Sequence, residues 1–229
     1  MKQIRPIVGV WILALTFSAC VGGKAIERSY FSIQYVLGES DRLYAEAPIP
    51  QKLQVNRFSA AIAYDRQEIV YRSDPHEFRY YWYKLWAAKP EKLVREQVLT
   101  HLQHTGIFEE VDGRVSDRRP HYELSGQVNA VEELDSVNGR WFAHLDITFT
   151  VSHSDDGSRV FEKRYAAKKE VFERRPVFVV RALSEILREH NQSLSKDLLD
   201  TLGSGAAKSG LNSPAADKGA IPNATLRTD

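Results

Sequence analysis

The chain of 229 residues contains a single cysteine, Cys20. One cysteine cannot close an intramolecular disulfide, and it has no second thiol with which to share a metal ion. Long hydrophobic runs are missing as well. The apolar run at residues 7–17 is too short for a hydrocarbon core that requires about 20 apolar residues. A retained transmembrane helix is therefore the weaker interpretation of the amino terminus.

An excess of charge of one sign is also absent, because 31 basic residues stand against 30 acidic ones. Without a basic excess, nucleic acid is not an expected partner. The sequence has no G-x-S-x-G, no H-E-x-x-H and no glycine-rich phosphate loop, which are patterns that carry hydrolytic, zinc and phosphate chemistry. We therefore predict that the protein is not an enzyme and binds no cofactor.

Two groups of residues resemble metal ligands, but neither predicts a bound metal. His101 and His104 lie three residues apart, with Glu109 downstream, and such spacing is common by chance. Half-buried or exposed histidines are the simpler interpretation. The segment 154–158 reads SDDGS, in which the two aspartates and the glycine are typical of a hairpin turn rather than of a calcium loop.

The amino terminus has the layout of a secretory signal peptide. A basic start precedes the apolar run, and the small residues Ser18 and Ala19 stand immediately before Cys20. This order predicts that residues 1–19 are a signal peptide that is removed. The alternative is that Cys20 lies by chance beside an ordinary cleavage site.

The remaining chain is long enough for one domain with a sizeable core. Residues 20–29 read as a short tether, and residues 30–202 carry the strand and helix patterns. From residue 203 the chain is rich in Gly, Ala, Ser and Pro with few large apolar residues. Because such a segment buries too little to offset its ordering entropy, residues 203–229 are predicted to be a disordered tail.

Alternating apolar residues predict several strands, and helical spacing predicts two helices. The early strands are expected at residues 29–37, 52–61, 68–72 and 76–87. The later runs are expected to form a three-stranded antiparallel meander over residues 122–130, 141–151 and 159–172, with charged residues marking the last as an edge strand. Helices are expected from Pro90 to Gly106 and from Pro176 to Gly203.

Strands with two long helices spaced by a meander indicate the α+β class. We predict a mostly antiparallel sheet with both helices packed on one of its faces. No internal repeat is visible in the sequence.

The aromatic strand at residues 76–87 contains FRYYWYKLW. Both of its faces are apolar enough to be covered, and the simpler interpretation is a central strand. As a functional alternative, Arg79, Tyr81 and Tyr83 form the candidate partner interface, because tyrosine, tryptophan and arginine commonly anchor protein interfaces.

Several short motifs give the chain a family resemblance. Phe17 to Cys20 resembles a bacterial lipobox, and four further patterns follow in order: V-x-R-F at 55–58, IVYR at 69–72, W-x-x-x-P at 86–90 and L-x-x-x-G-x-F-x-x-V at 102–111. Together they resemble the ABC-type transport auxiliary lipoproteins, a PqiC-like family associated with MCE-type lipid transport systems. The resemblance covers nearly the whole chain up to Leu202.

The resemblance implies a lipoprotein that carries a diacylglycerol and an N-acyl chain on Cys20. Val21, rather than aspartate, follows the cysteine, which implies the periplasmic face of the outer membrane. The implied partners are an MCE-domain periplasmic protein and an inner-membrane ABC or PqiA-like permease, and self-association into a ring stays open. The alternative is a stand-alone lipoprotein that binds a lipid or peptide in a pocket under the two helices.

Overall fold

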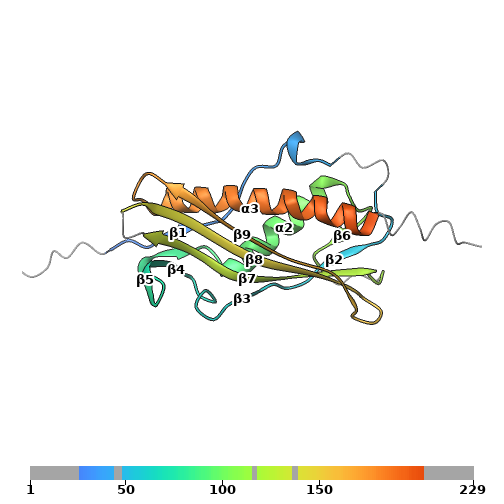
Figure 1. The fold of residues 1–229 in the computed structure, drawn as a ribbon, viewed down its shortest axis with the longest axis horizontal. Helices are drawn as coiled ribbons and strands as arrows, with labels where there is room; N and C mark the ends of the chain where they lie inside the picture. The colour runs from blue at the N-terminus through green and yellow to red at the C-terminus, as the bar shows by residue number, and fades with distance from the viewer. Residues whose placement is uncertain (1–25, 44–47, 115–117, 136–138, 204–229) are drawn as a thin grey trace, which may run out of the picture.

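The computed structural model describes residues 26–43, 48–114, 118–135 and 139–203. The expected signal peptide, Cys20 and residues 204–229 of the expected tail lie outside the described residues. Within the described segments, two long helices accompany a nine-stranded sheet (Figure 1). The α+β class predicted from the sequence is confirmed.

The longest strands form the predicted antiparallel meander. It consists of β7 (Tyr122–Asp135), β8 (Trp141–His153) and β9 (Arg159–Val171). Gly139 and Gly157 have positive φ angles of 71° and 70° at the two connections, a conformation that glycine adopts without steric cost. Among the described strands β9 pairs with β8 alone, so it is the edge strand that its charges predicted.

The shorter strands extend the sheet on the other side of β7, and many of them run parallel to their neighbours. They are β1 (Ser29–Phe31), β2 (Leu53–Val55), β3 (Ser59–Ala60), β4 (Glu68–Asp74), β5 (Glu77–Trp86) and β6 (Val111–Asp112). The strands β2, β3 and β4 each pair in parallel with β7, whereas β5 returns antiparallel to β4. The long pairings are thus antiparallel, and the short strands add parallel ladders.

Each helix begins where a proline predicted it. Helix α2 (Pro90–Thr105) ends at Gly106, whose φ of 72° is left-handed, and α3 (Pro176–Leu198) continues into a final turn, η3 (Leu199–Gly203). A single turn, η2 (Glu39–Asp41), precedes β2. Proline suits the first helical turn because that turn leaves its N–H groups unpaired anyway. No helix in the described segments combines the length and the apolar character needed to cross a bilayer.

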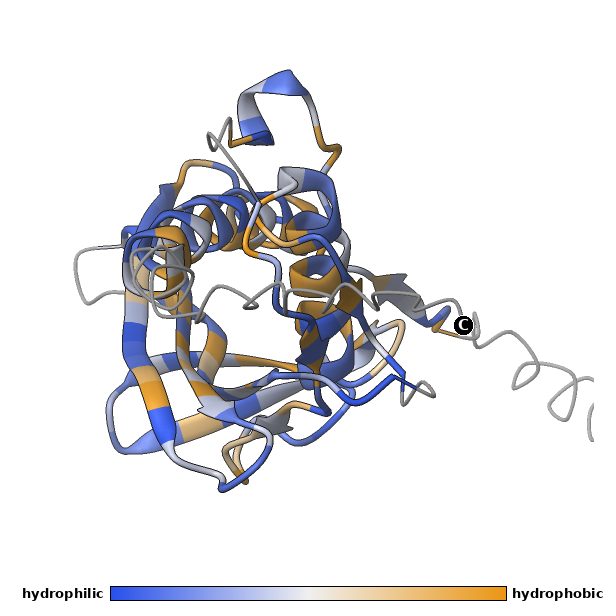
Figure 2. Cartoon of the chain, turned by 90° about the vertical axis from the view of Figure 1, so that its right-hand side faces the viewer, coloured by the Kyte–Doolittle hydropathy of each residue, from blue (hydrophilic) through white to orange (hydrophobic). Residues whose placement is uncertain are grey.

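The core lies between the helices and the sheet. Viewed from its end, the domain has α2 and α3 along one side and the sheet curving around the other, with hydrophobic residues between them (Figure 2). The predicted helical stripes are buried, and so is one face of the meander. The fully buried members include Val94, Val98, Leu124, Val128, Leu145, Ile147, Phe149, Leu183, Leu187, Leu194 and Leu198.

The first predicted strand is shorter in the structure than its sequence pattern. Only Ser29–Phe31 joins the sheet, although the alternation continues to residue 37. Beyond Phe31 the chain runs along the helices: the Gln34 amide donates to Ser184 Oγ at 3.1 Å, and Ile33 is buried. The prediction for residues 32–37 was wrong because alternating burial against helices resembles burial against a sheet.

Candidate partner-binding surface

Strand β5 lies between β1 and β4 and has an incompletely paired outer edge. On that side β1 pairs only with Lys84, Leu85 and Trp86. Among the described residues, no strand pairs with the outer edge of β5 before Lys84. Unpaired backbone groups along such an edge can accept a further strand from a partner.

The pairing between β5 and β4 is irregular in the middle of this edge. Glu68 pairs with Leu85 and Val70 pairs with Tyr80, so two steps along β4 (70 − 68) face five steps along β5 (85 − 80). The four residues of β5 between these two pairs, 81–84, therefore face only one residue of β4 and form a bulge. Bulges bend the strand and redirect side chains, and they are common next to functional sites.

The bulge carries the most exposed aromatic side chains of β5. Trp82 is 81% exposed and Tyr83 is 43% exposed. Tyr30, which lies opposite Leu85 in β1, adds a third exposed ring. We call Tyr30, Trp82 and Tyr83 the aromatic edge. The prediction that both faces of this strand are covered was wrong, because Trp86 is buried whereas Trp82 faces solvent.

Tyr81, a member of the predicted interface, is half-buried and engaged within the domain. Its hydroxyl donates to Glu133 Oε1 at 3.1 Å, and its ring stacks on Tyr71 with centroids 4.5 Å apart. The Lys84 ammonium lies 4.2 Å from the Tyr81 ring centroid. Burial raises the pKa of Glu133 to about 6, although the Tyr81 hydrogen bond and Lys84 oppose that rise. The contacts of Tyr81 therefore lie within the domain, where they stabilise β5, and little of its side chain is available to a partner.

Arg79 is exposed, but its charge is matched inside the same strand. Its Nε and Nη2 atoms each donate to the Glu77 carboxylate at 2.9 Å. A partner that binds Arg79 would have to compete with this exposed pair, and such pairs contribute little to stability. Of the three predicted interface residues, Tyr83 is thus the one whose side chain is most available.

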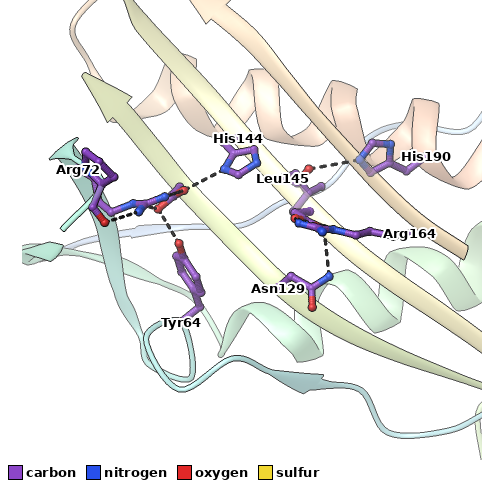
Figure 3. Close-up of polar contacts among 10 residues, drawn as sticks. Tyr64, Arg72, Asn129, His144, Leu145, Arg164 and His190 are labelled. Carbon is purple, nitrogen blue, oxygen red and sulfur yellow. Dashed lines mark hydrogen bonds and ion pairs between the residues drawn. The ribbon is translucent and has the colours of Figure 1, made fainter. Parts of the chain in front are cut away.

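A cluster of polar side chains around Glu132 lies between the sheet and the loop that precedes β4 (Figure 3). The fully buried Glu132 carboxylate accepts from Tyr64 Oη at 2.6 Å and from Arg72 Nε at 2.6 Å, and it lies 2.9 Å from His144 Nδ1. Burial alone would raise the pKa of Glu132, but the hydrogen bonds from His144, Arg72 and Tyr64 lower it. A buried carboxylate with these partners joins β4 and the preceding loop to the meander.

The neighbouring acid on β8 is held in the same way. Asp146 accepts from Asn129 Nδ2 at 3.0 Å and from Arg164 Nε at 2.9 Å, while His190 Nε2 lies 3.4 Å from the Leu145 carbonyl oxygen (Figure 3). Sequence reasoning missed both acids because their partners come from distant segments. The clusters join strands and helix to one another, and neither presents an open site.

The histidines considered as metal ligands have other partners. His101 Nδ1 lies 2.9 Å from Tyr35 Oη, and His104 Nε2 lies 3.0 Å from the Gly38 carbonyl oxygen. Burial lowers the pKa of His101 to about 4. In the described ranges, no group of three or more His, Cys, Asp or Glu residues is arranged to hold a metal ion. The Asp156 carboxylate accepts from the Ser158 amide at 2.8 Å, a contact typical of aspartate in a turn.

A cleft flanks α2. It has a volume of about 930 Å³ and is lined by apolar Phe58 and Leu99 together with charged residues that include Arg57 and Lys92. The sequence alternative placed a ligand pocket under the two helices, whereas that space is filled by the core. Cys20, the predicted lipidation site, lies outside the described residues.

Comparisons with known proteins agree with the fold. A family model described as an ABC-type transport auxiliary lipoprotein component matches residues 35–195. The crystal structure of protein XCC0632 from Xanthomonas campestris, a DUF330 protein, is similar with a TM-score of 0.68 and 18% identity, covering 79% of this chain and 99% of that one. An uncharacterized protein of solved structure has a TM-score of 0.56 and 11% identity, covering 76% and 99%. None of the curated proteins matches the chain.

Proposed function

The chain belongs to the family of ABC-type transport auxiliary lipoprotein components, and we propose that it is a non-catalytic docking component of an envelope lipid transport system. In this proposal Cys20 carries the lipid anchor at the periplasmic face of the outer membrane. The domain then receives an MCE-domain periplasmic protein, which connects it to an inner-membrane ABC or PqiA-like permease. The transported material is lipid.

The aromatic edge is the observation that supports a docking role. Trp82 projects from a bulge with 81% of its surface exposed, next to unpaired backbone of β5. Exposing the large apolar surface of a tryptophan side chain to water is unfavourable in free energy. Tryptophan and tyrosine contribute much of the binding energy of many protein interfaces. The free edge adds main-chain hydrogen bonds to a partner strand. The partner surface therefore centres on Trp82 and Tyr83, with Arg79 at its margin.

Affinity purification from crosslinked envelopes tests this proposal. We expect the full-length protein to enrich an MCE-domain protein or its permease over a control lipoprotein. A Trp82→Ser variant is expected to lose about 2 kcal/mol of binding, which is roughly a 30-fold weaker affinity. Ile62→Ser is the matched control, because Ile62 is an exposed apolar residue outside β5. The proposal fails if the unaltered protein enriches neither partner.

The cleft beside α2 supports one alternative function. Phe58 and Leu99 offer apolar surface beside charged side chains of both signs, a combination that suits an amphipathic ligand such as a lipid or peptide. In this alternative the protein is a stand-alone ligand-binding lipoprotein. Native mass spectrometry distinguishes the two, because a lipid or peptide bound in fixed stoichiometry without any co-purifying transport component favours the alternative.

A further inference from the structure

The first described residues and the start of α3 lie at the same end of the domain (Figure 1). After β1 the chain runs alongside α3 in the same direction, since Gln34 bonds to Ser184 and Asp41 pairs with Arg188 at 2.7 Å. Residues before Gln34 therefore lead back toward Pro176, the first residue of α3. The turn between β9 and α3 lies at this end as well.

This end exposes several large apolar side chains. Phe172, in the turn after β9, is 90% exposed, and Ile26 and Val177 are also exposed. We call Ile26, Phe172 and Val177 the apolar end. A phenylalanine ring that faces water almost completely is costly, because burying such a side chain contributes about 1.5–3 kcal/mol.

Arginines paired with aromatic rings surround the apolar end. The Arg174 guanidinium lies 5.2 Å from the Trp141 ring, and the Arg175 guanidinium lies 4.6 Å from the Phe178 ring. Asp135 and Glu173 balance the two charges, at 3.8 Å and 2.7 Å respectively. Neutral groups of arginine and aromatic side chains around an apolar tip are typical of surfaces at the boundary between lipid and water.

The length of the chain that precedes Ile26 determines what this end can face. Five residues lie between Cys20 and Ile26, which are thus six steps apart along the chain, so the two lie within about 20 Å of each other even when the chain is fully extended. An acyl chain on Cys20 would therefore hold this end close to the bilayer that contains it. The β2–β6 end, at the other side of the domain, would be directed away from that bilayer (Figure 1).

We propose that the apolar end is a membrane-contact surface, in which the Phe172 ring enters the headgroup region of the anchoring bilayer while Arg174 and Arg175 remain among the headgroups. This inference rests on the lipid anchor of the proposed function. Side chains of this type bury their apolar parts about 5–10 Å into the interface. The contact orients the domain, so that β5 and the cleft beside α2 are presented at a defined height above the membrane.

Fluorescence quenching in vesicles tests the orientation. The full-length gene product is purified from envelopes in detergent and reconstituted into phosphatidylethanolamine and phosphatidylglycerol vesicles with brominated acyl chains. One variant carries Phe172→Trp, and its matched control carries Val36→Trp, because Val36 is 88% exposed and lies beyond β1, in the segment that runs alongside α3. We expect the emission added at position 172 to fall by about half in brominated vesicles, with no fall at position 36.

The outcomes separate this inference from the proposed function. Equal emission at both positions in brominated and unbrominated vesicles overturns the membrane contact, even when the protein floats with the vesicles. If the protein does not float with them, the anchor itself is disproved, and the orientation that depends on it is disproved too. The affinity purification described above tests the docking role separately, because enrichment of an MCE-domain protein does not depend on either vesicle result.

Discussion

The Tyr81 hydroxyl donates a hydrogen bond to the buried carboxylate of Glu133 across 3.1 Å, joining β5 to the meander. Glu133 is 1% exposed, and its second carboxylate oxygen has no partner within the described residues. Burial is the main reason that its pKa lies near 6 instead of 4.5. The base of the aromatic edge is therefore attached to an acid that titrates close to neutrality.

We expect the stability of the protein to fall as pH rises through the pKa of Glu133. The folded pKa exceeds the unfolded value, so the neutral carboxyl is favoured by folding. This favourable contribution is present below pH 4.5 and is lost as the pH passes 6. The loss amounts to about 2 kcal/mol. Urea denaturation of Glu133→Gln between pH 4.5 and 7.5 should show a smaller pH dependence than the unaltered protein, and an unchanged dependence would contradict this assignment.

Removing the Tyr81 hydroxyl should destabilise the protein more at pH 7.5 than at pH 5. Tyr81→Phe leaves the ionised carboxylate of Glu133 without its donor, which costs about 1–3 kcal/mol. At pH 5 the acid is mostly neutral and the loss should be smaller. Tyr83→Phe is the matched control on the exposed part of β5 and should change the free energy of unfolding by less than about 0.5 kcal/mol. Equal losses for Tyr81→Phe at both pH values would argue against the coupling.

Arg72 of β4 pairs with Glu132 of β7, and Arg79 pairs with Glu77 of its own strand, but the two pairs differ in burial. Glu132, the partner of Arg72, is fully buried, whereas Arg79 and Glu77 are both about half exposed. Arg72→Met should destabilise the protein by about 3–5 kcal/mol, because it leaves a buried charge undercompensated. Arg79→Met should change the free energy of unfolding far less, because solvent screens its exposed pair with Glu77. Chemical denaturation of the two variants checks the difference, and similar losses would contradict the burial argument.

Gly126 of β7 allows Phe58 to pack against the sheet. A Cβ atom at position 126 would lie 2.7 Å from two ring atoms of Phe58. Gly126→Ala should therefore destabilise the protein by about 1–3 kcal/mol through overpacking. In a double-mutant cycle, Phe58→Leu should remove part of that penalty. Strictly additive effects would show that the ring is not the obstacle.

Cys20→Ser tests the predicted anchor. If Cys20 carries acyl chains, the variant should move from the membrane to the soluble periplasmic fraction, because each buried methylene contributes about 0.8 kcal/mol to membrane binding. Val36→Ser, which keeps Cys20, should remain with the membrane. Quantitative retention of Cys20→Ser in the membrane fraction would show that another feature holds the protein there.

Sequence patterns predicted the helix starts and ends correctly where a single residue fixes the backbone conformation. Pro90 and Pro176 mark the helix starts and Gly106 marks a helix end, because proline and glycine restrict or permit backbone angles at their own positions. The strand pattern failed at residues 32–37, where helices take the place of a neighbouring strand. The three residues predicted to form a partner interface lie on β5, but the most exposed ring of that strand, Trp82, was not among them.

The sequence by itself determined the family, the helix boundaries, the meander and the buried stripes, since these depend on residue order and spacing. Only the tertiary structure decided that Trp86 is buried while Trp82 is exposed, although both belong to one alternating set on β5. Trp82 lies in the bulge of β5, whereas Trp86 lies beyond it, where β1, a segment more than 50 residues away, pairs with the strand. The exposure of a side chain depends on such distant neighbours, which the spacing of residues within one strand does not specify.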